Sequence, residues 1–329
     1  MNYQGWRQHR DQLLLTRDPL RLDCMNPFHA LDHMRLPGGK SDGVAPDPES
    51  VAQAWAVCTG VELHKGRWLP TRGVRSTLEA WCRTDQAQEA CLWLPGDIFP
   101  TYWTIAQSAG LATRRFSTLS ALNLDALHAA GSKDCLLLPV PLSPVGRELA
   151  TSEVDFLLSW LGQSPQRLLF LDLVYAYHGS GHVGLDRLRS TGQCIEAWSI
   201  SKTWIQRQVF GVAVMPEGLK SALAPHLAPP GAEALAQAVA CFSAQPDLPS
   251  RQQERFDAQW LSLGETVRMA HSKWCAPARG YFGILPISAA DLLEKHDMLA
   301  VPASVFGTLE KDLSVITCLH DIKRDDEAT

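Results

Sequence analysis

The middle of the chain alternates short apolar runs with segments of helical periodicity. The runs predicted to be strands cover residues 68–71, 90–94, 135–140, 168–171, 195–201 and 209–215. Between them, helices are predicted over residues 76–83, 102–109 and 153–161. Continuous apolar runs are typical of strands buried on both faces, as parallel sheets require. The predicted fold class is therefore α/β, with a mostly parallel sheet and helices on both of its faces.

The start of the chain has a different, more polar pattern. Residues 1–22 are expected to be largely helical, and a loop should follow around Asn26-Pro27, because the residue before a proline is held extended. Residues 36–48 carry three glycines and three prolines and are typical of a linker. The next predicted helix has Asp47 or Ser50 as its N-cap.

The pattern after Met215 is mainly helical up to residue 273, and strand-like sequence returns at 280–286 and 313–319. Helices followed by a few late strands predict a smaller α+β domain, which the N-terminal segment could join. The expected division is an N-terminal segment 1–45 joining the small domain, a large domain 46–217 and a small C-terminal domain 218–329.

Composition narrows the function classes. The 329 residues carry a net charge of −5 without a basic block, which argues against nucleic acid and an anionic membrane surface as partners. No apolar stretch approaches the length of a membrane span, and the polar N-terminus lacks the apolar core of a secretion signal, so a cytoplasmic protein is expected. Nine scattered cysteines without a Cys-x-x-Cys pair favour neither a disulfide scaffold nor a metal site.

Lys202 is the main candidate for chemistry. It ends the sequence Ser199-Ile200-Ser201-Lys202, thirty residues after Asp172, which closes the apolar run 168–171. The carboxyl ends of parallel strands are where open α/β sheets bind ligands. A lysine desolvated there has a lowered pKa and an amine that attacks carbonyl groups. The alternative is a solvated lysine at a helix start, with an acid that only caps the next helix.

Further motifs follow in chain order, and they are Asn26-Pro27, Thr71-Arg72-Gly73-Val74-Arg75-Ser76, Asp97-Ile98-Phe99-Pro100-Thr101-Tyr102, the proline-rich run 138–146, Arg279-Gly280-Tyr281-Phe282, and Val301-Pro302 before Gly307. Together with Asp172-x-x-Tyr175 and the lysine motif, they make residues 20–317 resemble the fold-type I, pyridoxal-phosphate-dependent aminotransferases of classes I and II. The resemblance is greatest to the branch of histidinol-phosphate aminotransferase and threonine-phosphate decarboxylase.

The resemblance implies a cofactor, pyridoxal 5'-phosphate, and a role for each motif residue. Lys202 would hold the cofactor as a Schiff base and then move the substrate's α-proton. Asp172 would face the pyridine nitrogen and keep it protonated, and Tyr175 would point its hydroxyl at the phenolic oxygen. The ring of Phe99 would stack on the cofactor, although an ordinary core phenylalanine is the alternative at this position.

The cofactor phosphate would lie at the start of a helix. Gly73, Val74 and Arg75 resemble the glycine turn whose backbone N–H groups bind this phosphate, because a helix N-terminus is a natural anion site. Ser199 and Ser201 would add hydroxyl donors.

Three positions depart from the family pattern. Ser143 replaces the asparagine that bonds the phenolic oxygen. The family's phosphate arginine would fall at Phe210, and the nearest arginine, Arg207, is our candidate to replace it. The late strand 313–317 lacks the arginine that holds the substrate carboxylate. Either another arginine, such as Arg279 or Arg75, binds this carboxylate, or the substrate lacks a standard α-amino-acid end.

The leading functional interpretation is an aminotransferase that acts on an amino acid or amine as a homodimer, whose sites the neighbouring subunit completes. The missing arginine keeps open a decarboxylase, eliminase or cyclase of specialised metabolism. A non-catalytic partner that kept the fold is the alternative from another class.

Overall fold

The computed structural model describes residues 2–31, 34, 45–119, 121–122, 124–177, 179, 181–182 and 184–319. Most of the predicted linker 36–48 therefore lies outside the described residues, as does the end of the chain.

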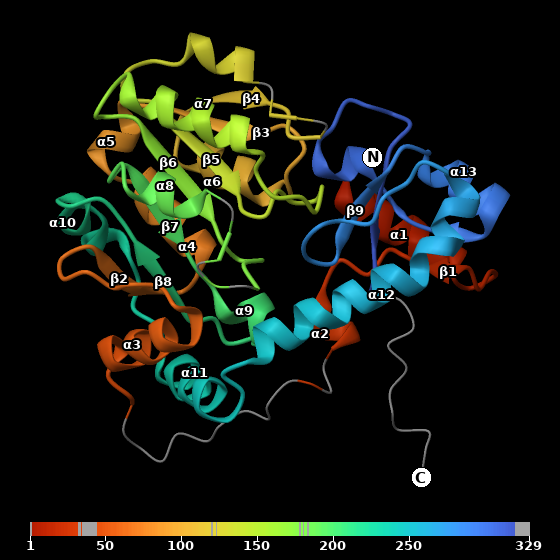
Figure 1. The fold of residues 1–329 in the computed structure, drawn as a ribbon, viewed down its shortest axis with the longest axis horizontal. Helices are drawn as coiled ribbons and strands as arrows, with labels where there is room; N and C mark the ends of the chain where they lie inside the picture. Colours follow the sequence, from red (N-terminus) through yellow and green to blue (C-terminus); the bar gives the residue numbers. More distant parts are fainter. Residues whose placement is uncertain are drawn as a thin grey trace.

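A seven-stranded sheet forms the centre of the larger part of the molecule (Figure 1). Its strands, in spatial order, are β2 (Trp68–Thr71), β8 (Gly211–Val214), β7 (Cys194–Ala197), β6 (Leu168–Asp172), β5 (Cys135–Pro139), β3 (Cys91–Pro95) and β4 (Ala112–Phe116). Only β8 runs antiparallel to its neighbours; the other adjacent pairs are parallel. The mostly parallel sheet predicted from the apolar runs is thus confirmed.

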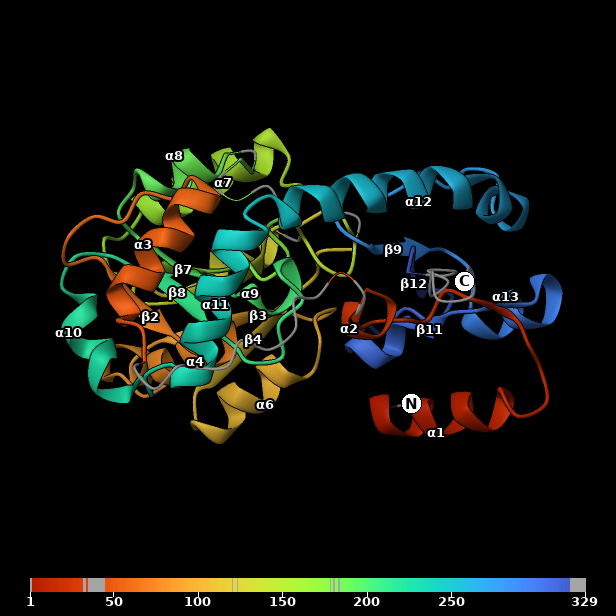
Figure 2. The same ribbon diagram turned by 90° about the horizontal axis from the view of Figure 1, so that it is seen from below.

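Helices cover both faces of this sheet, as Figure 2 shows. One face carries α3 (Pro48–Thr59), α7 (Thr151–Gly162), α8 (Leu185–Arg189) and α11 (Ala232–Ala244), and the other carries α4 (Val74–Cys82), α6 (Thr101–Ser108) and α10 (Leu219–Leu223). Each layer buries large side chains against the strands, with Trp55 and Trp160 on the first face and Trp81 on the second. The short helices α5 (Asp85–Gln88), η2 (Leu124–Ala129) and η3 (Ala224–His226) also belong to this part.

The two ends of the chain share a separate core. Its elements are α1 (Tyr3–Leu13), β1 (Leu20–Arg21), α2 (Pro27–Ala30), α12 (Leu248–Ala270), β9 (Phe282–Leu285), α13 (Ala289–His296), β10 (Met298–Leu299), β11 (Val301–Pro302), η4 (Ala303–Phe306) and β12 (Ser314–Thr317). Strand β1 pairs with β10, and β11, β12 and β9 form an antiparallel sheet. The N-terminal segment therefore packs with the C-terminal one, although the domain boundaries themselves stay a prediction.

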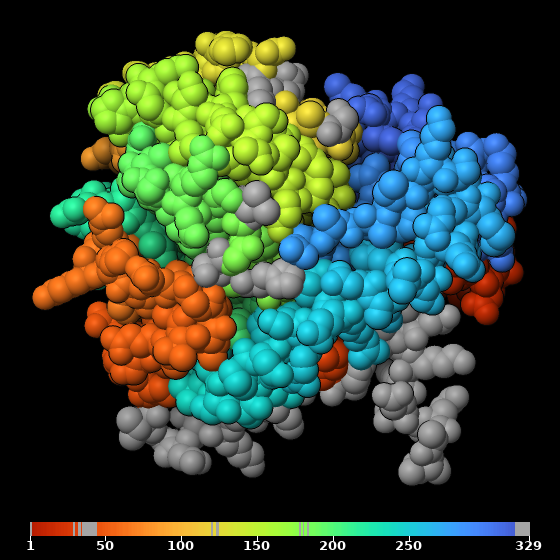
Figure 3. Space-filling view, in the orientation of Figure 1, coloured from red at the N-terminus to blue at the C-terminus, as the bar shows by residue number. Residues whose placement is uncertain are grey.

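The long helix α12 runs from the larger part toward this second core (Figures 1 and 2). The surface view shows the blue C-terminal residues lying directly against the yellow-green middle segment (Figure 3). One polar contact across this boundary joins Arg279 Nε to Glu148 Oε1 at 3.0 Å.

Some boundaries differ from the prediction. Helix α4 begins at Val74, two residues earlier than expected, which makes Gly73 its N-cap. The segment 195–201 is not one strand, because β7 ends at Ala197 and α9 (Ile200–Thr203) follows. Asp47 is the N-cap of α3, and its carboxylate accepts from the backbone N–H of Ser50.

Strand β4 was not predicted. Its sequence, Ala-Thr-Arg-Arg-Phe, lies at the edge of the sheet, where exposed polar side chains hide the apolar pattern of a strand. Within the described residues, no helix has the length and apolar character needed to cross a membrane. All nine cysteines are free thiols.

Candidate active site

A cavity of about 380 Å³ opens at one edge of the central sheet. Strands β2, β3, β5, β6 and β7 point the same way, so their carboxyl ends meet at this edge. The loops that follow these strands, and segments from both ends of the chain, line the cavity. This is the place where open α/β sheets bind ligands, and the volume is typical of small-molecule sites.

Lys202 reaches the cavity from α9, which follows β7 directly. The side chain of Ser199 caps this short helix by accepting from the backbone N–H of Ser201. The Lys202 Nζ atom donates to Asn26 Oδ1 at 3.0 Å and lies 4.7 Å from the centroid of the Phe28 ring. Burial, and then the charge of Arg75, lower the pKa of Lys202 to about 8. About a tenth of its amine is therefore uncharged at pH 7, far more than for an ordinary lysine.

Asp172 ends β6 and is only 2% exposed. Its carboxylate accepts hydrogen bonds from the Tyr102 hydroxyl and, at 3.0 Å, from the backbone N–H of Val174. Burial raises the pKa of Asp172 to about 6 despite these bonds. A buried acid and a lysine with a lowered pKa, both lining one cavity, are an arrangement typical of functional sites.

Tyr102 is a site residue that the sequence analysis missed. It stands in the first turn of α6, three residues after Phe99, so the start of this helix brings it to Asp172. Burial and the Asp172 charge raise the pKa of its hydroxyl, which keeps the proton on Tyr102 and makes it the donor. The spacing after Phe99 at a predicted helix start was the available signal.

The N-terminus of α4 faces the same cavity. Gly73 has φ 83° and ψ −172°, and a Cβ atom there would lie 2.8 Å from Val209 Cγ1 and 2.9 Å from Ser199 Oγ. The absence of a side chain thus lets the turn approach the serine loop. The N–H groups of residues 74–76 have no carbonyl partner within the helix, as at any helix start. The hydroxyls of Ser199 and Ser201 are 3.0 Å apart beside them. This corner can bind an anion.

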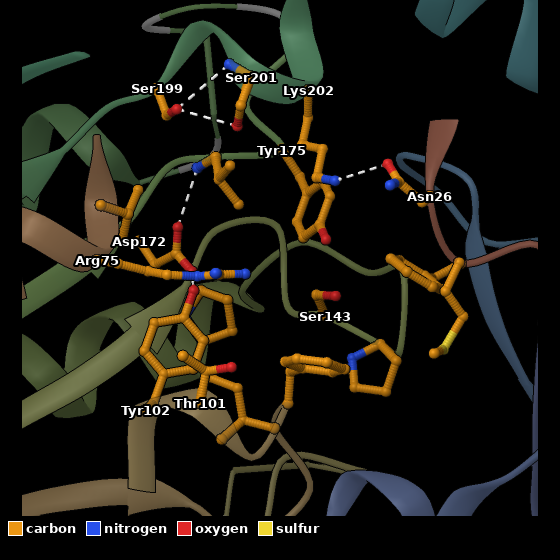
Figure 4. A pocket seen from close by; sticks show the side chains of 18 of the residues that line it. Asn26, Arg75, Thr101, Tyr102, Ser143, Asp172, Tyr175, Ser199, Ser201 and Lys202 are labelled. Carbon is orange, nitrogen blue, oxygen red and sulfur yellow. Dashed lines mark hydrogen bonds between the residues drawn. The ribbon is translucent and has the colours of Figure 1, made fainter. Parts of the chain in front are cut away.

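Three arginines add positive charge to the cavity. Arg72, Arg75 and Arg207 line it, and all three are exposed. None forms an ion pair within the described part of the chain. Figure 4 shows the Arg75 guanidinium beside the Asp172 carboxyl group, inside the cavity. Phe210, in contrast, is fully buried in the core, so no cation stands at the position where the sequence resemblance implies a phosphate arginine.

The remaining predicted residues also meet here. Phe99, Ser143 and Tyr175 line the cavity together with Val74. Burial raises the pKa of Tyr175 to about 12. Of Lys202 and the residues predicted to bind the cofactor, Gly73 alone is not in the lining, although residues on both sides of it are.

Arg279 does not belong to this cavity. It lines a separate, smaller one, and its Nε is bonded to Glu148, which also contacts His182 Nδ1 at 3.0 Å. In the late strand β12, Val315 and Ile316 are fully buried. Of the two arginines considered for a substrate carboxylate, only Arg75 therefore faces the cavity.

Comparison with known proteins gives structural matches only. No family model and no curated protein matches the chain. Among solved structures, it is similar to an aspartate aminotransferase from Thermotoga maritima (14% identity, TM-score 0.74, covering 96% of this chain and 92% of that chain). It is also similar to a tyrosine aminotransferase from Leishmania infantum (16%, 0.71, 92% and 88%) and to N-succinyldiaminopimelate aminotransferase from Mycobacterium tuberculosis (18%, 0.67, 94% and 90%). The chain thus has the α/β fold of the fold-type I aminotransferases.

Proposed function

We propose that the protein is a pyridoxal-phosphate-dependent enzyme that acts on an amino acid or amine, with transamination as its leading reaction. One observation carries this proposal. The Lys202 amine, with its pKa lowered to about 8, and the buried Asp172 carboxyl face one cavity at the carboxyl edge of the sheet. The fold, shared with aminotransferases, supports the same interpretation.

The residues around the cavity fit this cofactor. Because Gly73 has no side chain, the start of α4 lies close to Ser199. The first N–H groups of α4 and the nearby arginines there suit a phosphate dianion. Phe99 offers a ring to stack on, Asp172 a carboxylate for a protonated ring nitrogen, and Tyr175 a hydroxyl. The Arg75 guanidinium lies beside the Asp172 carboxyl group, so the cofactor would have to bind this guanidinium or displace it (Figure 4).

Bound here, pyridoxal phosphate would stabilise negative charge at the substrate's α-carbon by spreading it into its ring. The chain's own residues would do the rest. Lys202 would take up and return the α-proton at Nζ, which requires its amine to be uncharged. Asp172 would keep its carboxylate charged toward the ring nitrogen, and the Tyr102 hydroxyl would hold that carboxylate in place. Phe28 and the loop around Asn26 would keep water from the amine.

The reaction type is a separate proposal. With no arginine in the late strand, decarboxylation, elimination or cyclisation stays the second candidate. Candidate amino acids supplied with and without a keto-acid acceptor separate the two. Transamination gives a keto acid only with the acceptor, whereas carbon dioxide or an unsaturated product without it supports the alternative.

Three finer points are also proposed from the sequence. They are a relation to the histidinol-phosphate branch, a homodimer and a cytoplasmic location. The homodimer predicts a molar mass near twice that of the chain in light scattering, and a monomer would count against it.

The cofactor proposal is tested by the absorption spectrum of the protein after reconstitution with pyridoxal phosphate. A visible band of bound cofactor is expected, and Lys202→Ala should lose it. Lys220→Ala is the matched control, because Lys220 is also partly buried but lies over Trp68, away from the cavity. No band in the unaltered protein would favour the non-catalytic alternative.

A further inference from the structure

The side of the cavity formed by the two chain ends is aromatic and uncharged. Tyr3 from α1, Phe282 from β9 and Phe306 from η4 line it, and Phe99 faces them from the loop after β3. We call these four residues the aromatic wall. Phe282 and Phe306 are nearly fully buried, whereas Tyr3 and Phe99 are partly open to the cavity.

The four rings contact one another as a continuous surface. Tyr3 meets Phe99 edge to face with centroids 5.5 Å apart, Phe99 meets Phe306 at 6.3 Å, and Phe306 meets Phe282 at 6.4 Å. Edge-to-face pairs at these distances are favourable contacts, so the rings support each other's orientation. The wall is therefore a preformed apolar surface.

The cationic side chains that line the cavity all come from the middle segment of the chain. Arg72, Arg75, Lys202 and Arg207 belong to the middle segment of the chain, and the lining residues from the two chain ends include no charged group. A carboxylate placed against the wall would lose water without gaining a counter-charge, which is unfavourable. An apolar group placed there would gain the free energy of burial.

We propose that the aromatic wall is the subsite for the substrate's side chain, and that the substrate is an amino acid or amine whose side chain is aromatic or large and apolar. Any acidic group of the substrate then faces the arginines of the middle segment. This inference rests on the proposed function, because it assumes that a small amino compound reacts at Lys202.

Tyr3 is the residue of the aromatic wall that is best suited to a substitution test. It is the first residue of α1 and only partly buried, so its replacement should disturb the core less than replacement of Phe282 or Phe306. Tyr3→Phe keeps the ring and serves as the matched control, whereas Tyr3→Ala removes the ring. Tyr3→Lys brings a cation to the wall.

The test measures binding by calorimetry to the cofactor-loaded protein, with ligands that lack an amine and cannot react. 3-Phenylpropanoate and glutarate share one carboxylate and differ in the group that would meet the wall. We expect 3-phenylpropanoate to bind at least about tenfold more tightly, from the burial of its ring. Tyr3→Ala should reduce this ratio several-fold, Tyr3→Phe should preserve it, and Tyr3→Lys should improve glutarate binding.

Equal or tighter binding of glutarate to the unaltered protein would overturn the inference, and so would an unchanged ratio in both Tyr3→Ala and Tyr3→Lys. The visible cofactor band, recorded on the same samples, separates this outcome from a failure of the proposed function. If no band forms, the proposed function fails and the inference falls with it. If the band forms but the ratio does not favour the aromatic ligand, only the inference is wrong.

Discussion

Lys202 Nζ donates a hydrogen bond to Asn26 Oδ1 over 3.0 Å, so a loop from the start of the chain holds the amine that the middle of the chain supplies. Because Asn26 is neutral, it bonds the amine without stabilising its charged form as a carboxylate would. Burial and the charge of Arg75 lower the pKa of Lys202, and the neutral Asn26 does not oppose them.

Asn26→Asp should therefore raise the pKa of Lys202. A smaller fraction of the Lys202 amine is then uncharged at neutral pH. The rate of cofactor binding, measured by the growth of the visible band, should therefore fall below pH 8. Asn2→Asp is the matched control, because Asn2 caps α1 and aspartate caps helices equally well. The pH midpoint, at which the rate of cofactor binding is half of its maximum, should rise in Asn26→Asp. An unchanged midpoint would contradict this account of the Lys202 pKa.

Arg75→Gln should shift the same midpoint upward. The Arg75 charge lowers the pKa of Lys202 and also that of Asp172, so its removal raises both. Arg207→Gln should leave the midpoint in place, because Arg207 is not a cause of either shift. Affinities for pyridoxal phosphate and for pyridoxal, which lacks the phosphate, then show which arginine binds the phosphate. That arginine is the one whose loss weakens only the phosphorylated form.

Asp172→Asn should stabilise the cofactor-free protein at neutral pH. A carboxyl pKa raised from 3.8 to about 6 means that the folded state binds the proton more tightly than the unfolded state. The charged form then costs up to roughly 3 kcal/mol above pH 6, and this cost vanishes below pH 4. Denaturant unfolding at pH 8 and pH 4 should show the advantage of Asp172→Asn only at pH 8.

The same substitution should weaken cofactor binding, because the neutral amide cannot hold a proton on the ring nitrogen. Stability and function would then change in opposite directions, as expected for an acid buried for its chemistry. Equal destabilisation at both pH values would instead indicate that Asp172 is a structural hydrogen-bond acceptor.

Much of the fold and of the site could be predicted because buried strands appear in the sequence as continuous apolar runs. The run 168–171 and the motif at Lys202 predicted the sheet edge where Asp172 and Lys202 meet. Strand β4 was not predicted, because its side chains are mostly exposed and it has no continuous apolar run.

Contacts between distant segments could not be predicted in the same way. Tyr3 and Phe306 stand at opposite ends of the sequence, and no local pattern indicates that they line one cavity. Likewise, only packing reveals that Arg279 is bonded to Glu148 and is therefore directed away from the site.

Gly73→Ala should lower the free energy of unfolding and also weaken the phosphate site. At φ 83° and ψ −172° the backbone is in a region almost restricted to glycine, which costs about 1–3 kcal/mol for other residues. The new Cβ would also press on Val209 and Ser199. Gly192→Ala is the control, since it has positive φ but open space around it. We expect a larger loss of unfolding free energy in Gly73→Ala, and weakened phosphate binding in that variant alone.

The most direct test of the account is to locate the cofactor on the chain. The protein reconstituted with pyridoxal phosphate is reduced with borohydride, digested and examined by mass spectrometry. The account predicts one modified lysine, Lys202, and no modification of Lys220. An unmodified Lys202, or a cofactor fixed to another lysine, would contradict it.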